Sequence, residues 1–300
     1  MLELIEEIKV LKAERNALIL AHNYVRPEIQ DLADFTGDSL ELSIKARDAQ
    51  APLMVFCGVR FMAETAKLLS PDSTVLLPNP DADCHMARMA DGEQVKAWRS
   101  EFPDAVFAAY VNTTAEAKAQ VDICCTSGNA EKVVRSLEGK KVVFLPDRNL
   151  GGNINNKLGT EMALWNGCCP VHDQVTPEML KGAREFFPDA AIIIHPECKV
   201  ECTALADAAL STAGMLKFVK DSHKSTFVVA TESGLLHRLK KENPGKRFIP
   251  LAPEIICPDM KKITLEDLRD ALKFNQHEII LPPEVMENAV KPIEKMLALS

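Results

Sequence analysis

The feature that most constrains the fold of this chain is an internal repeat of about 85 residues. The peptide Phe102-Pro103-Asp104-Ala105 returns 85 residues later as Phe187-Pro188-Asp189-Ala190. The same offset relates Cys84 to Cys169, and an offset of 88 residues relates Cys169 to Cys257. Self-similarity at a nearly constant spacing indicates one supersecondary unit that is used several times. The sequence therefore predicts three related units.

Each unit is predicted to begin with a helix and a fully buried strand. Apolar residues at helical spacing are followed each time by a continuous apolar run, and a further apolar run comes later in the unit. Strands that are apolar on both faces and separated by helices are typical of parallel sheets covered on two sides. The expected buried strands are residues 17–21 and 53–57, 106–109 and 141–145, and 191–194 and 226–230.

The predicted fold class is therefore α/β, with three homologous three-layer αβα domains whose parallel sheets are related by a pseudo-threefold axis. The expected domains are residues 1–84 plus 260–300, residues 85–169, and residues 170–259. In this division the tail from Ile263 completes the first domain with a helix, a strand at residues 278–281 and a last helix.

Composition and charge exclude several classes of protein. Hydrophobic residues make up 47% of the chain and charged residues 26%, which is the range of folded globular domains. The net charge of −8 and the lack of a basic block interleaved with aromatic residues argue against nucleic acid as a partner. No apolar run reaches the roughly 18 to 20 residues that span a membrane, and no signal-peptide pattern is present. We therefore expect a cytoplasmic protein without a membrane partner and, despite nine cysteines, without a disulfide framework.

Polar side chains follow the first strand at the same position in every unit. In open α/β sheets, ligands bind beyond the carboxyl ends of the strands, so these residues are candidates for one central cavity. A single polar residue at a strand end is more often a hydrogen-bonded boundary residue, but packing does not explain why all of them fall at one phase of the repeat. The residues are His22 and Tyr24, Tyr110 and Asn112, and His195 and Glu197.

A hydroxyl side chain lies near a glycine at the expected start of the next helix in each unit. We expect Ser39, Ser127 and Thr212 to cap these helices. Helix N-termini also attract anions, so the same positions are candidates for binding carboxylate or phosphate groups.

One cysteine of each unit lies in a loop at the same phase of the repeat, namely Cys84, Cys169 and Cys257. Three thiolates that meet on an axis leave one coordination position open, as a catalytic metal requires. Soft thiolate ligands select zinc, copper(I) or an iron–sulfur cluster, and the separations of 85 and 88 residues match no zinc-finger spacing. A 4Fe-4S cluster with one open iron fits this pattern best, with that iron acting as a Lewis acid in a dehydration without redox change.

The remaining cysteines are not expected to bind metal. Those in or beside apolar strands are expected in the core, where free cysteine behaves as a small hydrophobe. Cys168 adjoins Cys169, but only Cys169 keeps the register of the repeat. The core candidates are Cys57, Cys124 and Cys125, and the candidates for lining the site beside Glu197 are Cys198 and Cys202.

Several short stretches carry a family resemblance. They are Ala21-His22-Asn23-Tyr24, Gly37-Asp38-Ser39, Tyr110-Val111-Asn112, Pro146-Asp147-Arg148-Asn149-Leu150-Gly151, Cys169-Pro170-Val171-His172, His195-Pro196-Glu197-Cys198, Ser211-Thr212 with Gly214, and Cys257 with Met260-Lys261. With them the chain resembles the quinolinate synthase family, A type, of NAD (pyridine nucleotide) biosynthesis over essentially its full length. That resemblance implies three αβα domains around a central 4Fe-4S cluster. It also implies a transferase that condenses iminoaspartate with dihydroxyacetone phosphate to quinolinate, releasing phosphate and two waters.

The resemblance further implies roles for particular residues. Cys84, Cys169 and Cys257 look like the cluster ligands. Tyr24 and Glu197 resemble the acid–base residues, with His22 and His195 as further catalytic candidates. A transient hand-off of iminoaspartate from the enzyme that produces it is a possible partnership. The implied substrate-binding residues are His22, Tyr24, Ser39, Tyr110, Asn112, Ser127, His172, His195, Glu197, Ser211 and Thr212.

Two alternatives stay open at the level of sequence. A cluster-dependent hydro-lyase acting on another small hydroxy acid would keep the three thiolates but would not need to bind both a phosphate and a dicarboxylate. An iron–sulfur scaffold or redox-sensing protein would hold a fully ligated or transferable cluster and would form no product.

Overall fold

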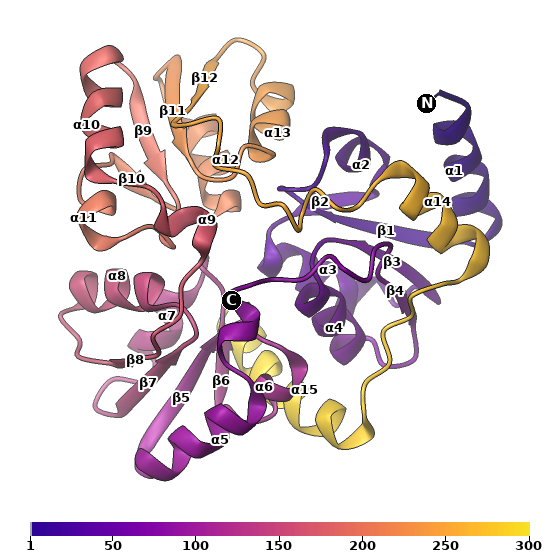
Figure 1. The fold of residues 1–300 in the computed structure, drawn as a ribbon, viewed down its shortest axis with the longest axis horizontal. Helices are drawn as coiled ribbons and strands as arrows, with labels where there is room; N and C mark the ends of the chain where they lie inside the picture. Colours follow the sequence, from indigo (N-terminus) through magenta and orange to yellow (C-terminus); the bar gives the residue numbers. More distant parts are fainter. Residues whose placement is uncertain (1) are drawn as a thin grey trace.

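The computed structural model describes residues 2–300, and Met1, with which the expected first domain begins, lies outside the described residues. Three four-stranded parallel sheets, each flanked by helices, are arranged around a common centre (Figure 1). The predicted α/β fold with three αβα units is confirmed. No described helix combines the length and the apolar character needed to cross a membrane.

The first sheet has the strand order β2-β1-β3-β4. Its central strands β1 and β3 are almost wholly buried, as their continuous apolar sequences predict. The elements of this unit are α1 (Leu2–Glu14), β1 (Ala17–His22), α2 (Pro27–Leu32), β2 (Phe35–Gly37), α3 (Ser39–Ala49), β3 (Leu53–Cys57), α4 (Arg60–Leu69) and β4 (Thr74–Leu76).

The second and third sheets repeat this order as β6-β5-β7-β8 and β10-β9-β11-β12. After the short 3-10 helix η1 (Ala87–Met89), the second unit contains α5 (Gly92–Glu101), β5 (Ala105–Tyr110), α6 (Ala115–Lys118), β6 (Ile123–Cys125), α7 (Ala130–Arg135), β7 (Lys141–Leu145), α8 (Arg148–Leu158) and β8 (Ala163–Leu164). The third contains α9 (Pro170–Asp173), α10 (Pro177–Phe186), β9 (Ala191–Ile194), α11 (Val200–Thr203), β10 (Ala208–Ala209), α12 (Thr212–Asp221), β11 (Thr226–Ala230), α13 (Leu235–Glu242) and β12 (Arg247–Pro250).

The strand register repeats together with the strand order. Leu20 pairs with Phe35 in the first sheet, and the residues 88 positions later, Ala108 and Ile123, pair in the second. In the third sheet Ile193 pairs with Ala208, again 85 positions further on. Residues 88 or 85 positions apart in the sequence therefore occupy equivalent positions in the three sheets.

An aspartate that directly precedes each edge strand shows the same repetition. Its carboxylate accepts a hydrogen bond of 2.6 to 2.8 Å from a backbone N–H of the first strand of the unit. It also pairs with a basic side chain of the helix that comes before this first strand, which is α1, α5 or α10. This contact ties strand, edge and helix together in every unit. The three sets are Asp34 with Ile19 and Lys12, Asp122 with Phe107 and Arg99, and Asp207 with Ile192 and Arg184.

The tail of the chain bridges two units. Helix α14 (Leu265–Phe274) packs on α1 and β3, whereas α15 (Pro283–Ala298) packs on β6 and α6 of the second unit. The strand expected at residues 278–281 is wrong, because only an isolated antiparallel bridge joins Glu278 to Leu76. Pro282 and Pro283 follow at once, and proline has no N–H with which to extend a ladder.

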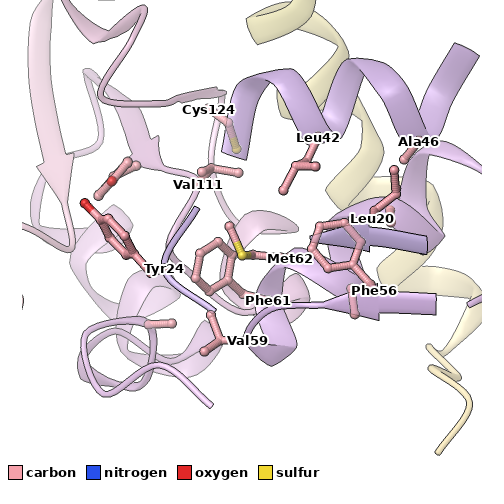
Figure 2. Packing of buried hydrophobic residues seen from close by; sticks show 14 of the residues in the cluster. Leu20, Tyr24, Leu42, Ala46, Phe56, Val59, Phe61, Met62, Val111 and Cys124 are labelled. Carbon is pink, nitrogen blue, oxygen red and sulfur yellow. The ribbon is translucent and has the colours of Figure 1, made fainter. Parts of the chain in front are cut away.

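The hydrophobic core of the first unit extends toward the centre at which the three units meet. Figure 2 shows Leu20 and Phe56 of the sheet packed near Leu42 of α3, with Phe61 and Met62 of α4 extending toward Tyr24. Burial of this kind holds the ends of β1 and α4 in fixed positions.

Candidate active site

A cavity of about 430 Å³ lies where the three units meet. Residues from every unit line it, and they include nearly all of the candidate site residues. These are His22, Tyr24 and Ser39 with Cys84; Tyr110, Asn112 and Ser127 with Cys169; and His172, His195, Glu197 and Thr212 with Cys257. Among the described residues, Ser211 is a candidate that lies outside this lining.

The helix caps differ from the expected ones. Asp38, not Ser39, caps α3, and it forms a capping box with Glu41. Ser211, not Thr212, caps α12 by accepting a hydrogen bond from Gly214. The expected caps at Ser39 and Thr212 are therefore wrong by one residue, since an oxygen one position earlier reaches the free N–H groups.

The second unit also departs from the expected capping pattern. The N-cap of α7 is Asn129, not Ser127. Ser39 and Ser127 are thereby left to face the cavity, while the hydroxyl of Thr212 accepts a hydrogen bond of 2.8 Å from Asn23.

A chain of short contacts connects the two tyrosines of the molecule through the cavity wall. The hydroxyl of Tyr24 lies 2.5 Å from Oγ1 of Thr231, which lies 2.8 Å from Nε2 of His172. Nδ1 of His172 lies 2.7 Å from Oε2 of Glu197, and Oε1 of Glu197 accepts a hydrogen bond of 2.6 Å from the hydroxyl of Tyr110. Residues of all three units thus form one continuous path of polar contacts.

Glu197 is the charged member of this path. Burial on its own would raise the pKa of its carboxyl, but His195 and His172 beside it and the hydrogen bond from Tyr110 outweigh burial, so the pKa lies well below its usual range. Burial raises the pKa of Tyr24 and Tyr110, and the charge of Glu197 raises both further. At neutral pH the path therefore holds one carboxylate and two protonated phenols.

His22 and His195 are neutral under the same conditions. Burial lowers the pKa of each imidazole to about 3. Each ring accepts a hydrogen bond at Nδ1 from the backbone N–H two residues later, from Tyr24 at 3.2 Å and from Glu197 at 3.4 Å. The repeat thus places two equivalent imidazoles as hydrogen-bonding groups that carry no charge.

The three cysteines of the repeat register face the same cavity. Burial raises the pKa of Cys84 and Cys169, and raises that of Cys257 to about 11, so the thiols become thiolates only when a metal displaces their protons. Among the described residues, the ligand atoms that lie within 4.8 Å of one another belong to Cys169, His172 and Glu197, without Cys84 or Cys257. The three sulfur atoms therefore do not all lie within 4.8 Å of one another, which suits a multinuclear cluster better than one ion.

The described residues that line the cavity include neither lysine nor arginine. Hydroxyl and amide groups are the neutral donors of this lining, because Asp38 and Ser211 already accept hydrogen bonds from backbone N–H groups in the first turns of α3 and α12. The unpaired Oδ1 of Asn112 is one further polar atom on this surface.

Sequence reasoning missed the residues that follow the third strand of a unit. Thr231 and Glu232 come directly after β11, and Asp147 follows β7 at the position equivalent to Glu232. All three are buried. The signal that could have found them is the polar side chain directly after a buried apolar strand, which is present at the end of the third strand as well as the first.

The other cysteines lie away from the cavity. Cys57, Cys124 and Cys125 are fully buried in the core, as predicted. Cys198 and Cys202 pack in the core of the third unit and do not line the cavity, so the expectation for them is wrong. The cause is the first turn after β9, which directs Glu197 inward and its neighbour Cys198 into the apolar layer.

Fold and site together define an α/β enzyme that acts on a small molecule at a centre shared by three repeated units. Residues 6–298 match the family model described as Quinolinate synthetase A protein. Proteins named quinolinate synthase from Methanoregula boonei and Thermodesulfovibrio yellowstonii are 50% and 47% identical, over 98% of this chain and 97% and 98% of theirs. A quinolinate synthase from Aquifex aeolicus is 46% identical over 99% of this chain and 94% of its own. The chain belongs to the quinolinate synthase family, whose members are enzymes of NAD biosynthesis.

Proposed function

We propose that this enzyme condenses iminoaspartate with dihydroxyacetone phosphate and forms quinolinate, phosphate and two waters. We further propose that Cys84, Cys169 and Cys257 hold a 4Fe-4S cluster with one open iron. The observation that carries the proposal is the path from Tyr24 to Tyr110, which contacts Cys169 at His172, at a cavity that Cys84 and Cys257 also line. When bound, the cluster supplies a Lewis acid for the removal of hydroxide.

The protein side chains supply the proton transfers in this proposal. Glu197 acts as the base that removes a proton from a carbon next to a carbonyl or imine, because it is ionised and enclosed. His172 and Thr231 pass protons along the path, and Tyr24 donates a proton to a departing hydroxyl. Tyr110 keeps Glu197 oriented and ionised.

Binding of the two substrates is assigned to neutral donors. Ser39, Asn112 and Ser127 would receive the carboxylates and the phosphate. Because an imine hydrolyses readily in water, direct transfer of iminoaspartate from the enzyme that makes it is part of the proposal.

The test is product formation by anaerobically reconstituted protein. Quinolinate should form only when both substrates are present, and product from one substrate alone would contradict the proposal. Glu197→Gln should keep its iron content and lose product formation. Glu242→Gln, an exposed carboxylate on α13 that pairs with Arg238, is the matched control and should behave as wild type.

A further inference from the structure

We propose that the cluster-free protein has a second metal site, in which Cys169, His172 and Glu197 bind one zinc-type divalent ion. This donor set differs from the proposed cluster ligands and shares only Cys169 with them, and to that extent the inference rests on the proposed function. The three ligand atoms lie within 4.8 Å of one another. Thiolate, imidazole and carboxylate are the ligand types of catalytic zinc, with the fourth position open.

The distances between the donor atoms are close to those of a tetrahedral site. With Zn–N of about 2.0 Å and Zn–S of about 2.3 Å, neighbouring ligand atoms should lie roughly 3.3 to 3.6 Å apart. Nδ1 of His172 lies 3.3 Å from Sγ of Cys169. It lies 2.7 Å from Oε2 of Glu197, so that contact would lengthen by about half an ångström as the ion replaces the proton between them.

Two of the three donors are already oriented by a second group. Nε2 of His172 lies 2.8 Å from the hydroxyl of Thr231, and Oε1 of Glu197 accepts a hydrogen bond from Tyr110. Partners of this kind fix the ring and the carboxylate in the geometry that a metal needs. His172 is 2% exposed and Glu197 4% exposed, so water competes little for either donor.

Zinc and the proposed cluster compete for one donor. The thiol of Cys169 loses its proton on binding either of them. Because the cluster requires the same sulfur of Cys169, zinc and cluster exclude one another.

The experiment is an anaerobic titration of cluster-free protein with zinc against a competing chromophoric chelator. Wild type should bind one zinc ion per chain. His172→Gln and Glu197→Gln should weaken binding by more than the roughly tenfold to hundredfold that loss of an outer partner costs, and Thr231→Val should weaken it within that range. Cys84→Ser and Cys257→Ser are matched controls and should bind zinc as wild type does.

The same variants separate this inference from the proposed function. Zinc-loaded wild type should take up no cluster from iron and sulfide until the zinc is chelated, whereas His172→Gln should take up the cluster in the presence of zinc. Equal loss of zinc in Cys84→Ser and His172→Gln would overturn the inference, because it would indicate a site of three thiolates. Stoichiometric zinc in a wild type that assembles no cluster would support this site and remove the proposed function.

Discussion

The hydroxyl of Tyr110 donates a hydrogen bond of 2.6 Å to Oε1 of Glu197 and so joins the second unit to the third inside the cavity. The repeat aligns Tyr110 with His195 and Asn112 with Glu197. Equivalent positions therefore carry different chemistry, and a carboxylate from one unit meets a phenol from another. The repeat accounts for the convergence of these positions, and the difference in residue type between the units accounts for the pair.

Tyr110→Phe removes the hydroxyl that stabilises the Glu197 carboxylate. Hydrogen bonds to charged groups contribute about 1.5 to 3 kcal/mol, so the pKa of Glu197 should rise by roughly one to two units. Infrared spectra of the cluster-free protein should show the Glu197 carboxylate becoming protonated at a pH higher by that amount than in wild type. Protonation at an unchanged pH would contradict the role assigned to this hydrogen bond.

Thr231→Val interrupts the contact between Tyr24 and His172 at nearly constant volume. If protons pass through this hydroxyl, kcat should fall by roughly a hundredfold or more, with little change in KM. Thr231→Ser restores a hydroxyl and should recover most of the loss. Equal activity of the Val and Ser variants would show that Thr231 serves packing alone.

Glu232 holds the loop of the third candidate ligand. It is fully buried, and its Oε1 lies 2.8 Å from Nζ of Lys261 and accepts a hydrogen bond of 3.2 Å from the backbone N–H of Cys257. Lys261 also donates to the carbonyl of Tyr24. A Cβ on Gly234 would lie 2.7 Å from that carbonyl oxygen, which is why only glycine fits there.

Glu232→Gln should therefore loosen the attachment of Cys257 without unfolding the protein. We expect iron release to a chelator to become roughly tenfold faster, as for loss of other outer partners of metal ligands. The rate is followed by the loss of cluster absorption, with Glu242→Gln as the control. Release at the wild-type rate would rule out this positioning role.

His22 gives the cluster-free protein a pH-dependent stability. The folded state holds its pKa at about 3, whereas the unfolded chain has a value near 6.5. Between these values the unfolded state binds the extra proton, so stability should fall as the pH drops from about 6.5, by up to about 1.4 kcal/mol per pH unit. His22→Gln should flatten the slope of the unfolding free energy measured between pH 6 and pH 4, roughly by that amount. An equal slope in wild type and variant would contradict a buried neutral imidazole.

The central strands could be predicted from sequence because they are continuous apolar runs. β3, β7 and β11 match their predicted bounds, since burial on both faces removes polar alternation. The edge strands, such as β8 and β10 with two residues each, carry no such signal. Pairing with a neighbouring strand, rather than local composition, makes them strands.

The repeat allowed us to predict those site residues that occupy equivalent positions in the three units. It predicted that Tyr24, Tyr110 and Glu197 line one cavity, because equivalent strand ends meet at the centre. It did not reveal Thr231, whose role depends on the side-chain distances to Tyr24 and His172. Nor did it give the capping residue of α3, because Asp38 and Ser39 are both good caps in sequence.

The central claim is that one sulfur from each unit holds a shared cluster. Iron and sulfide should be counted per chain after anaerobic reconstitution of wild type and of the single Cys→Ser variants. The account predicts about four iron atoms in wild type and in Cys168→Ser, and severe loss in Cys84→Ser, Cys169→Ser and Cys257→Ser. Equal loss in Cys168→Ser, or retention of the full cluster without Cys84 or Cys257, would contradict it.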